Sequence, residues 1–390
     1  MSEFDGAQLR KTWRDELGEW LKVSASQLDD AIDIRWRDFR KRMGIEGIPQ
    51  LQPYIGYGNA QRIWLHGRVL TNPPAELPDE DDTWWENIAN TYRRLASDEV
   101  PGCSIEIRLG DAVTRVVSDR EGYFHVNSPH VIAESRRGLW SLASMQIVDH
   151  PLVSPEKSTA IARLMIPPAD ARFGVISDVD DTIMHTGATR LLTMAKLTFL
   201  HNARTRLPLV GAATLYEMLH AGGKNPLFYV SSSPWNLFDL LEDFIELNRL
   251  PLGPILLRDL GFDENKFLKE GHDHKLDKVR NILATYDDLP FVLIGDSGQE
   301  DARLYATAAE EFPDRIRAIF IRDIDPLESS ARDEVITRFA VRASNVEVPM
   351  FLVQDSGQAA EIAASLDLMD DADVEAVRKA TKTDEDRSAV

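Results

Sequence analysis

The sequence predicts an α/β fold with a parallel sheet, preceded by a small antiparallel β domain and by N-terminal helices. Two patterns carry this prediction. After Pro168, short apolar runs alternate with helix-like stretches, which is typical of parallel strands joined by crossover helices. Between residues 61 and 166, short stretches of alternating apolar and polar residues are separated by Gly/Asp turns, which is typical of antiparallel strands.

Length and composition set the broad class of the protein. The chain has 390 residues, which predicts two domains with appendages. No apolar run approaches the roughly 18 residues of a membrane-spanning helix, and the first residues lack the pattern of a secretory signal. The single cysteine, Cys103, excludes an internal disulfide and a cysteine-rich zinc site. We therefore expect a cytoplasmic protein without a transmembrane segment, and peripheral attachment to a membrane stays open.

The net charge narrows the class of partners. The formal charge is -20 at pH 7, which argues against nucleic-acid binding because a phosphate backbone needs a basic surface. The same acidity counts against simple electrostatic adhesion to anionic membranes.

Residues 1–50 carry apolar side chains at helical spacing, including Leu9, Trp13, Leu17 and Trp20. We expect two N-terminal helices that pack on the body of the protein or on a second subunit, so that they could form an oligomer.

Residues 60–168 predict the β domain. Ile105, Ile107 and Leu109 alternate with polar residues, and the turn at Gly110 leads into a further strand. We expect a small antiparallel β-sandwich. The Gly67-Arg68-Val69 start and the Gly122-Tyr123-Phe124 step resemble prealbumin-like modules found beside enzymes.

Residues 169–368 predict the parallel domain, and residues 369–390 predict an acidic, disordered tail rich in Asp, Glu, Lys, Ala and Thr. The parallel domain contains five short apolar runs that we expect to be strands: 173–177, 227–231, 255–257, 291–294 and 318–321.

An acidic cluster follows the first of these strands. Asp178, Asp180 and Asp181 come directly after the apolar run 173–176, and Thr182 follows them. Ligands of open α/β sheets bind at the carboxyl edge of the strands. Carboxylates crowded there need a cation or a shared proton, and Mg²⁺ meets that need and also recruits phosphate. One Asp could then attack phosphorus while another moves the proton. The alternative for such a cluster is a solvated turn.

Two further strand ends or helix starts carry suitable groups. Ser231, Ser232 and Ser233 follow the second strand and could hold a phosphate oxygen, or could simply cap a helix. Lys275 could neutralise a transferring phosphoryl group, or could be a surface lysine.

The fourth group is Asp296, which follows the strand 291–294 and Gly295, with Asp301 five residues later. This pattern could place Asp296 beside the first cluster, with Asp301 near Lys275 or in the second metal shell. The alternative is a capped turn. All four groups occur near carboxyl strand edges, and this joint pattern favours a phosphoryl-transfer site.

The motifs resemble those of the haloacid-dehalogenase superfamily of phosphohydrolases, whose Asp-x-Asp-x-Thr pattern is matched by residues 178–182. The strings 229–235 and 293–298 are similar to one branch of it, the actin-patch-associated phosphatidate phosphatase family of Mg²⁺-dependent enzymes. The resemblance covers about residues 172–325. It implies a Rossmann-like parallel sheet with a minimal cap and an aspartyl-phosphate mechanism.

The resemblance also implies roles for the acidic residues. Asp178 would be the nucleophile and a metal ligand. Asp180 would be the general acid/base and would bind the metal through its carbonyl. Asp296 would ligate Mg²⁺, with Asp301 and Thr182 in support.

The remaining matched positions would hold the phosphoryl group. Ser231 would orient it, with Ser232 and Ser233 as neighbouring alternatives. Lys275 would neutralise the nucleophile and a phosphoryl oxygen.

Phosphatidate is the substrate that the resemblance implies, which places the substrate at a membrane surface. Residues 184–226 leave room only for a small lid, so the site would admit a bulky phosphomonoester. Leu191 to Leu200 could touch acyl chains, although a buried helix face is the simpler interpretation. Two alternatives stay open: a phosphatase of sugar phosphates or phosphoproteins, and a non-catalytic interaction protein that holds a cation.

Overall fold

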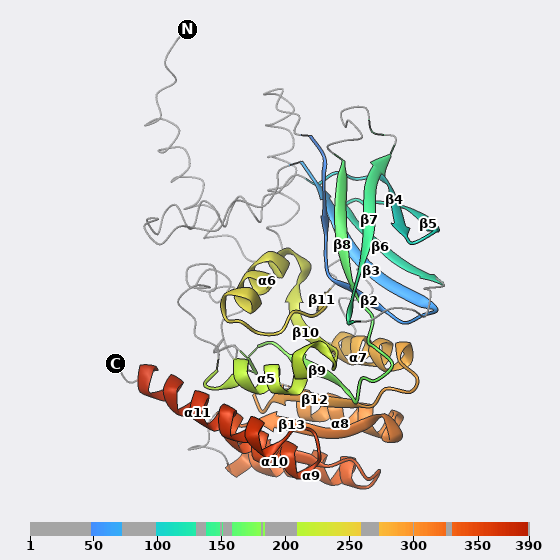
Figure 1. Cartoon of the computed structure of the whole chain (residues 1–390). Helices are drawn as coiled ribbons and strands as arrows, with labels where there is room; N and C mark the ends of the chain where they lie inside the picture. Colours follow the sequence, from blue (N-terminus) through green and yellow to red (C-terminus); the bar gives the residue numbers. More distant parts are fainter. Residues whose placement is uncertain are drawn as a thin grey trace, which may run out of the picture.

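Figure 1 shows a computed structural model of the chain. The structure describes residues 48–71, 99–129, 138–148, 150, 158–180, 182–183, 209–258, 273–298, 300–324 and 330–388. The predicted N-terminal helices lie outside these ranges, and so does the leucine-rich stretch 191–200.

Eight strands form the N-terminal domain, in the order β1-β3-β2-β8-β7-β4-β5, with β6 paired to β3. The pairs are antiparallel except for β2 and β8, which run parallel. The antiparallel domain is thus confirmed in outline, but its strands join into one mixed sheet that begins at Gln50 rather than two stacked sheets beginning near residue 60. The strands are β1 Gln50–Pro53, β2 Gly56–Gly58, β3 Arg62–Leu70, β4 Ser104–Leu109, β5 Ala112–Val117, β6 Tyr123–Pro129, β7 Trp140–Val148 and β8 Thr159–Met165.

Alternation of side chains gives this sheet its core. Ile105 and Ile107 of β4, Met145 of β7 and Leu164 of β8 belong to one buried cluster with residues of β3 and β6. Successive side chains of a strand point to opposite faces, so the sheet has one buried and one outer face. Strands from both parts of the sheet contribute to the same buried cluster, so the sheet curls round that cluster.

The C-terminal domain is built on a six-stranded parallel sheet in the order β11-β10-β9-β12-β13-β14 (Figure 1). The five predicted strands are confirmed, and β14 is an additional edge strand. The strands are β9 Gly174–Asp178, β10 Leu227–Pro234, β11 Ile255–Arg258, β12 Phe291–Asp296, β13 Ile316–Arg322 and β14 Met350–Val353.

Helices cover both faces of the parallel sheet. Buried residues of α5, α6, α10 and α11 share one apolar cluster, and those of α7, α8 and α9 share another. None of the helices in the described ranges combines the length and hydrophobicity needed to cross a bilayer. The helices are α5 Ala212–His220, α6 Phe238–Leu247, α7 Asp273–Thr285, α8 Asp301–Glu311, α9 Ser330–Ser344, α10 Ser356–Ser365 and α11 Asp371–Ser388.

Aromatic side chains join the two sheets. The ring of Trp235, just after β10, stacks on Tyr54 and on His66, with centroid distances of 5.1 Å in both cases. Tyr57 of β2 meets the edge of Phe228 in β10 at 5.5 Å. The part of the outer face formed by β1, β2 and β3 is therefore covered by the C-terminal domain.

The prediction that residues 369–390 form a disordered tail is wrong for most of that segment. Residues 371–388 form α11, which packs on α10 and α5. Val374, Val377 and Thr381 lie on one side of this helix and are buried, with Val377 fully so. The charged composition of the segment hid this narrow stripe, because three buried positions suffice to dock a helix whose other sides face water.

We expect the variant Val377→Ala to lower the free energy of unfolding by about 2 kcal/mol, since it leaves a cavity in a buried cluster. The control Lys379→Ala, an exposed position on the same helix, should change it by less than about 0.5 kcal/mol. Chemical denaturation measures both values. Equally small changes in the free energy of unfolding for both variants would mean that α11 does not pack on α10 and α5.

Candidate active site

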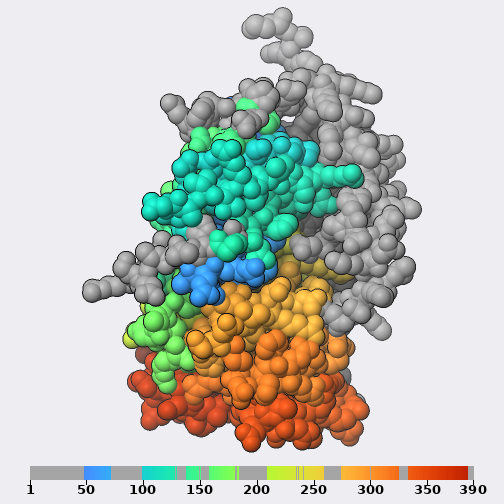
Figure 2. Space-filling view, turned by 90° about the vertical axis from the view of Figure 1, so that its right-hand side faces the viewer, coloured from blue at the N-terminus to red at the C-terminus, as the bar shows by residue number. Residues whose placement is uncertain are grey.

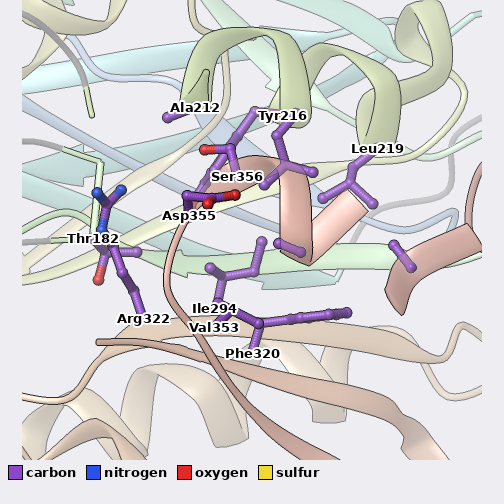
Figure 3. A pocket seen from close by; sticks show the side chains of 13 residues that line it. Thr182, Ala212, Tyr216, Leu219, Ile294, Phe320, Arg322, Val353, Asp355 and Ser356 are labelled. Atoms are coloured by element: carbon purple, nitrogen blue, oxygen red, sulfur yellow. The ribbon is translucent and has the colours of Figure 1, made fainter. Parts of the chain in front are cut away.

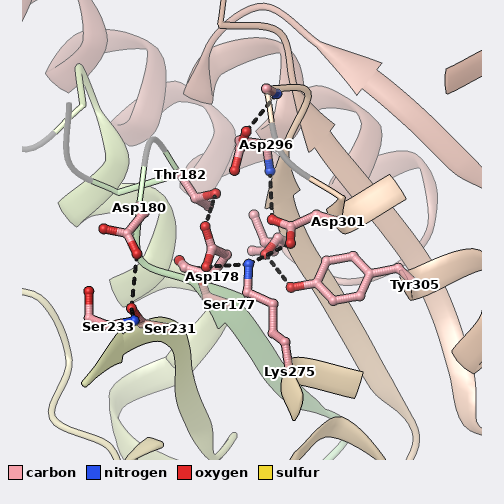
Figure 4. A network of polar contacts seen from close by, with 12 residues as sticks. Ser177, Asp178, Asp180, Thr182, Ser231, Ser233, Lys275, Asp296, Asp301 and Tyr305 are labelled. Atoms are coloured by element: carbon pink, nitrogen blue, oxygen red, sulfur yellow. Dashed lines mark hydrogen bonds and ion pairs between the residues drawn. The ribbon is translucent and has the colours of Figure 1, made fainter. Parts of the chain in front are cut away.

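The polar ends of three neighbouring strands meet at one edge of the parallel sheet. β9 lies between β10 and β12, with Asp178 opposite Val230 and Ser177 opposite Ile294. Because the strands are parallel, the residues that follow them emerge on the same side. The four groups singled out in the sequence are thus brought together, as Figure 4 shows for Asp178, Ser231, Lys275 and Asp296.

Lys275 is the centre of the site. Its Nζ lies 2.7 Å from Asp178 Oδ1 and 2.5 Å from Asp301 Oδ1. All three side chains are almost completely buried. A lysine at the start of α7 thus pairs with a carboxylate from the end of β9 and another from the start of α8.

Burial and charge act in opposite directions on these groups. Burial raises the pKa of the Asp178 carboxyl well above its usual value, and neighbouring carboxylates add to the effect while Lys275 reduces it. Burial alone would lower the pKa of Lys275, but Asp178 and Asp301 outweigh it and raise that pKa above its ordinary value. The two carboxylates therefore favour the charged form of Lys275, while burial disfavours the charged form of Asp178.

Thr182 and Ser177 fix the backbone around Asp178. The Thr182 hydroxyl donates to Asp178 Oδ2 over 3.2 Å. The Ser177 hydroxyl lies 2.6 Å from the Tyr216 hydroxyl. The predicted supporting role of Thr182 corresponds to this contact, which orients one oxygen of Asp178.

The Asp180 side chain points toward Ser231 (Figure 4). The Ser231 hydroxyl donates to Asp180 Oδ2 over 2.9 Å, and the backbone N–H of Ser233 donates to the Ser231 oxygen over 2.9 Å. The Ser232 hydroxyl is buried and accepts or donates no hydrogen bond within the described part of the chain. Of the three serines, Ser231 is thus the one in contact with another predicted site residue.

Close approach in the loop after β12 depends on glycine. The N–H of Asp296 donates to Asp301 Oδ2 over 3.2 Å, and the N–H of Gly298 donates to Asp296 Oδ1 over 2.6 Å. A Cβ on Gly295 would lie 2.6 Å from Asp301 Oδ2. Only a residue without a side chain allows Asp301 to fold back onto this loop.

Three carboxylates form a group that could hold a metal ion. One oxygen each of Asp178, Asp296 and Asp301 lies within 4.8 Å of the other two. Oxygen donors of this kind suit a hard divalent cation such as Mg²⁺. Asp301 uses one oxygen for Lys275 and the other for the Asp296 N–H. Asp178 likewise uses one oxygen for Lys275 and the other for the Thr182 hydroxyl, so these contacts do not rank the three carboxylates as candidate ligands.

Arg322 is a site-edge residue that the sequence analysis did not single out. It ends β13 opposite Asp296, and its carbonyl accepts the Ser297 N–H over 2.8 Å. The rule that identified the other residues, a polar side chain directly after an apolar strand, applies equally to Arg322.

A small apolar cavity adjoins this edge (Figure 3). Its volume is about 30 Å³, and its lining includes Thr182, Arg322, Tyr216, Ile294 and Phe320. This space is too small for an acyl chain. In this conformation, acyl chains of a lipid substrate would have to lie outside it.

Comparison with known proteins bears on residues 173–323, which match the family model of the catalytic domain of phosphatidate phosphatase APP1. The chain is similar to phosphatidate phosphatase APP1 of Saccharomyces cerevisiae, at 38% identity over 151 residues. It is also similar to an uncharacterized protein of Schizosaccharomyces pombe, at 25% identity over 211 residues.

These alignments cover only part of each protein. They take in 38% and 54% of this chain, and 25% and 34% of the two yeast proteins, respectively. Among solved structures, a carbohydrate acetylesterase from Xanthomonas citri aligns over 77% of this chain and 75% of its own, at 10% identity and a TM-score of 0.25. This TM-score is too low to inform the fold. The resemblance to the phosphatidate phosphatase family that the motifs predicted is thus confirmed for residues 173–323.

Proposed function

We propose that this protein is a Mg²⁺-dependent phosphatase that hydrolyses a phosphomonoester through an aspartyl-phosphate, with phosphatidate as its substrate. The observation that carries this proposal is the buried contact of Lys275 with Asp178 and Asp301, within reach of Asp296. The match of residues 173–323 to a phosphatidate phosphatase catalytic domain supports the choice of substrate.

In the first half of the reaction, one carboxylate oxygen of Asp178 attacks phosphorus and the bond from phosphorus to the leaving oxygen breaks. Asp180 gives its proton to that oxygen, so that diacylglycerol leaves as a neutral alcohol. The Lys275 ammonium stabilises the negative charge that develops between nucleophile and phosphoryl group.

In the second half, water attacks the aspartyl-phosphate and Asp180 takes the proton of that water. The products are phosphate and the restored Asp178 carboxylate. The Ser231 hydroxyl donates to the Asp180 side chain and would hold it in position for both proton transfers. A divalent cation held by Asp178, Asp296 and the Asp180 carbonyl would add positive charge at the phosphoryl oxygens and favour ionised Asp178.

The alternative is a non-catalytic protein that only binds a cation. That alternative does not account for the hydrogen bond from Ser231 to Asp180. A cation site needs the carboxylates near Lys275, but it needs no second carboxylate held apart from them by a serine.

We expect Asp178→Asn to lower turnover of phosphatidate and of p-nitrophenyl phosphate by roughly 10³-fold or more, because the nucleophile is gone. We expect Asp180→Asn to lower turnover by roughly 10²–10⁴-fold. Phosphate release measures both effects. Because only Asp180→Asn retains the nucleophile, mass spectrometry of acid-quenched protein should detect a phosphoryl group on that variant and not on Asp178→Asn. Undiminished hydrolysis by a folded Asp178→Asn protein would reject the mechanism.

We expect removal of divalent cations with a chelator to abolish turnover, and Mg²⁺ to restore it. Asp296→Asn should raise the Mg²⁺ concentration needed for half-maximal turnover by at least roughly tenfold. A suitable control is Asp355→Asn, which removes a carboxylate from the neighbouring cavity but keeps a residue that can cap α10. Equal Mg²⁺ requirements in both variants would argue against Asp296 as a ligand.

A further inference from the structure

The outer face of β5, β4, β7 and β8 exposes apolar side chains that a sheet normally buries. Nine large apolar residues in the described ranges are exposed, and five of them lie on this face. Leu142 and Ile161 have more than 60% of their surface exposed, at 61% and 64%. The other three are Val113, Val117 and Trp140.

These side chains are neighbours in the sheet. Leu142 pairs with Arg163, and Ser144, the next outward position of β7, pairs with Ile161. Leu142 and Ile161 are therefore diagonal neighbours on one face. Trp140 follows on the same strand, two residues from Leu142. The apolar residues thus form a stripe along β7 and β8, with the two valines of β5 at the sheet edge.

The charges on this face are mostly positive. Arg108, Arg115 and Arg163 point outward from β4, β5 and β8, against one acid within these strands, Glu106. Glu106 is buried beneath Arg115, which donates to it over 2.8 and 2.9 Å, and also pairs with Arg108. Arg163 has Glu242 of α6 in its vicinity. Three arginines thus lie beside the exposed apolar side chains of this face, and Glu106 and Glu242 offset part of their charge.

The other half of the outer face, formed by β1, β2 and β3, is covered by another domain of the chain. There, Tyr54 and His66 are covered by Trp235 of the catalytic domain. Figure 2 shows β4 and β5 as open surface on the N-terminal domain, above the catalytic domain. The uncovered half has the composition of a contact surface but no partner within the described part of the chain.

We propose that the outer face of β5, β4, β7 and β8 docks on an anionic lipid surface. Aliphatic side chains and a tryptophan can enter the headgroup region of a bilayer, and arginines pair with the phosphates around them. The inference rests on the proposed function in one respect, since a phosphatase of phosphatidate must work at a membrane. It locates the membrane contact on the N-terminal sheet rather than on the acidic remainder of the chain.

Vesicle flotation of the full chain tests this docking. The unmodified protein should float with phosphatidylcholine vesicles that contain phosphatidylserine, an anionic lipid that is not a substrate, and less with phosphatidylcholine alone. The double variant Leu142→Thr, Ile161→Thr keeps β-forming residues at both positions and should reduce partitioning about tenfold. Arg163→Gln should reduce the difference between the two vesicle types.

A matched control is Val341→Thr, an equally exposed apolar position, 57% exposed, on α9 of the catalytic domain. This variant should float like the unmodified protein. All variants should hydrolyse p-nitrophenyl phosphate and a water-soluble short-chain phosphatidate at the unmodified rate, while the double variant should hydrolyse vesicle-bound phosphatidate about tenfold more slowly.

The outcomes separate the two proposals. Equal flotation of the double variant and Val341→Thr, or no flotation of the unmodified protein, overturns the docking surface even if hydrolysis proceeds. Loss of a dimer in the double variant, seen by sedimentation velocity, would mean that a second copy covers this face instead. Flotation that depends on the face without any phosphatidate hydrolysis would reject the proposed function and keep the docking surface.

Discussion

The ion pair of Lys275 with Asp178 and Asp301 is the constraint around which the C-terminal domain is organised. With Asp296, the group holds three carboxylates against one ammonium, and all four are buried. Burying such an excess of negative charge costs several kcal/mol unless a cation or a proton compensates it. The raised pKa of Asp178 is the same cost expressed as proton affinity. A divalent cation would compensate this charge and, under the proposed function, would also attract the phosphate group of the substrate.

The candidate site was largely predictable because a parallel sheet turns sequence position into spatial position. Residues that directly follow buried strands must emerge at one edge, so their positions in the sequence already group Asp178, Ser231 and Asp296. The partners of each side chain could not be predicted in this way. β10 extends to Pro234 with an irregular register after Val230, and this local geometry decides which serine meets Asp180.

The features that sequence reasoning missed depend on long-range packing. Helix α11 is stabilised by a few buried positions against α10 and α5, and its own composition reads as a solvated tail. The parallel pairing of β2 with β8 joins residues more than a hundred positions apart, so that alternation alone could predict strands but not their partners. Local patterns thus define elements, while the order of strands in the N-terminal sheet is set by tertiary contacts.

If the outer face of β5, β4, β7 and β8 docks on lipid as proposed, the net charge of the whole chain is a poor guide to that contact. In physiological salt a charge acts over roughly 8 Å, so an acidic domain on the far side of the molecule contributes little at a given surface. What a lipid headgroup would encounter at the outer face of β7 and β8 is Arg163 beside Leu142 and Ile161, not the average of the whole chain. The same acidity, acting at other surfaces, would disfavour non-productive orientations on an anionic bilayer. A face that combines arginines with exposed apolar side chains, on a chain of net charge -20, would therefore favour one orientation at an anionic bilayer.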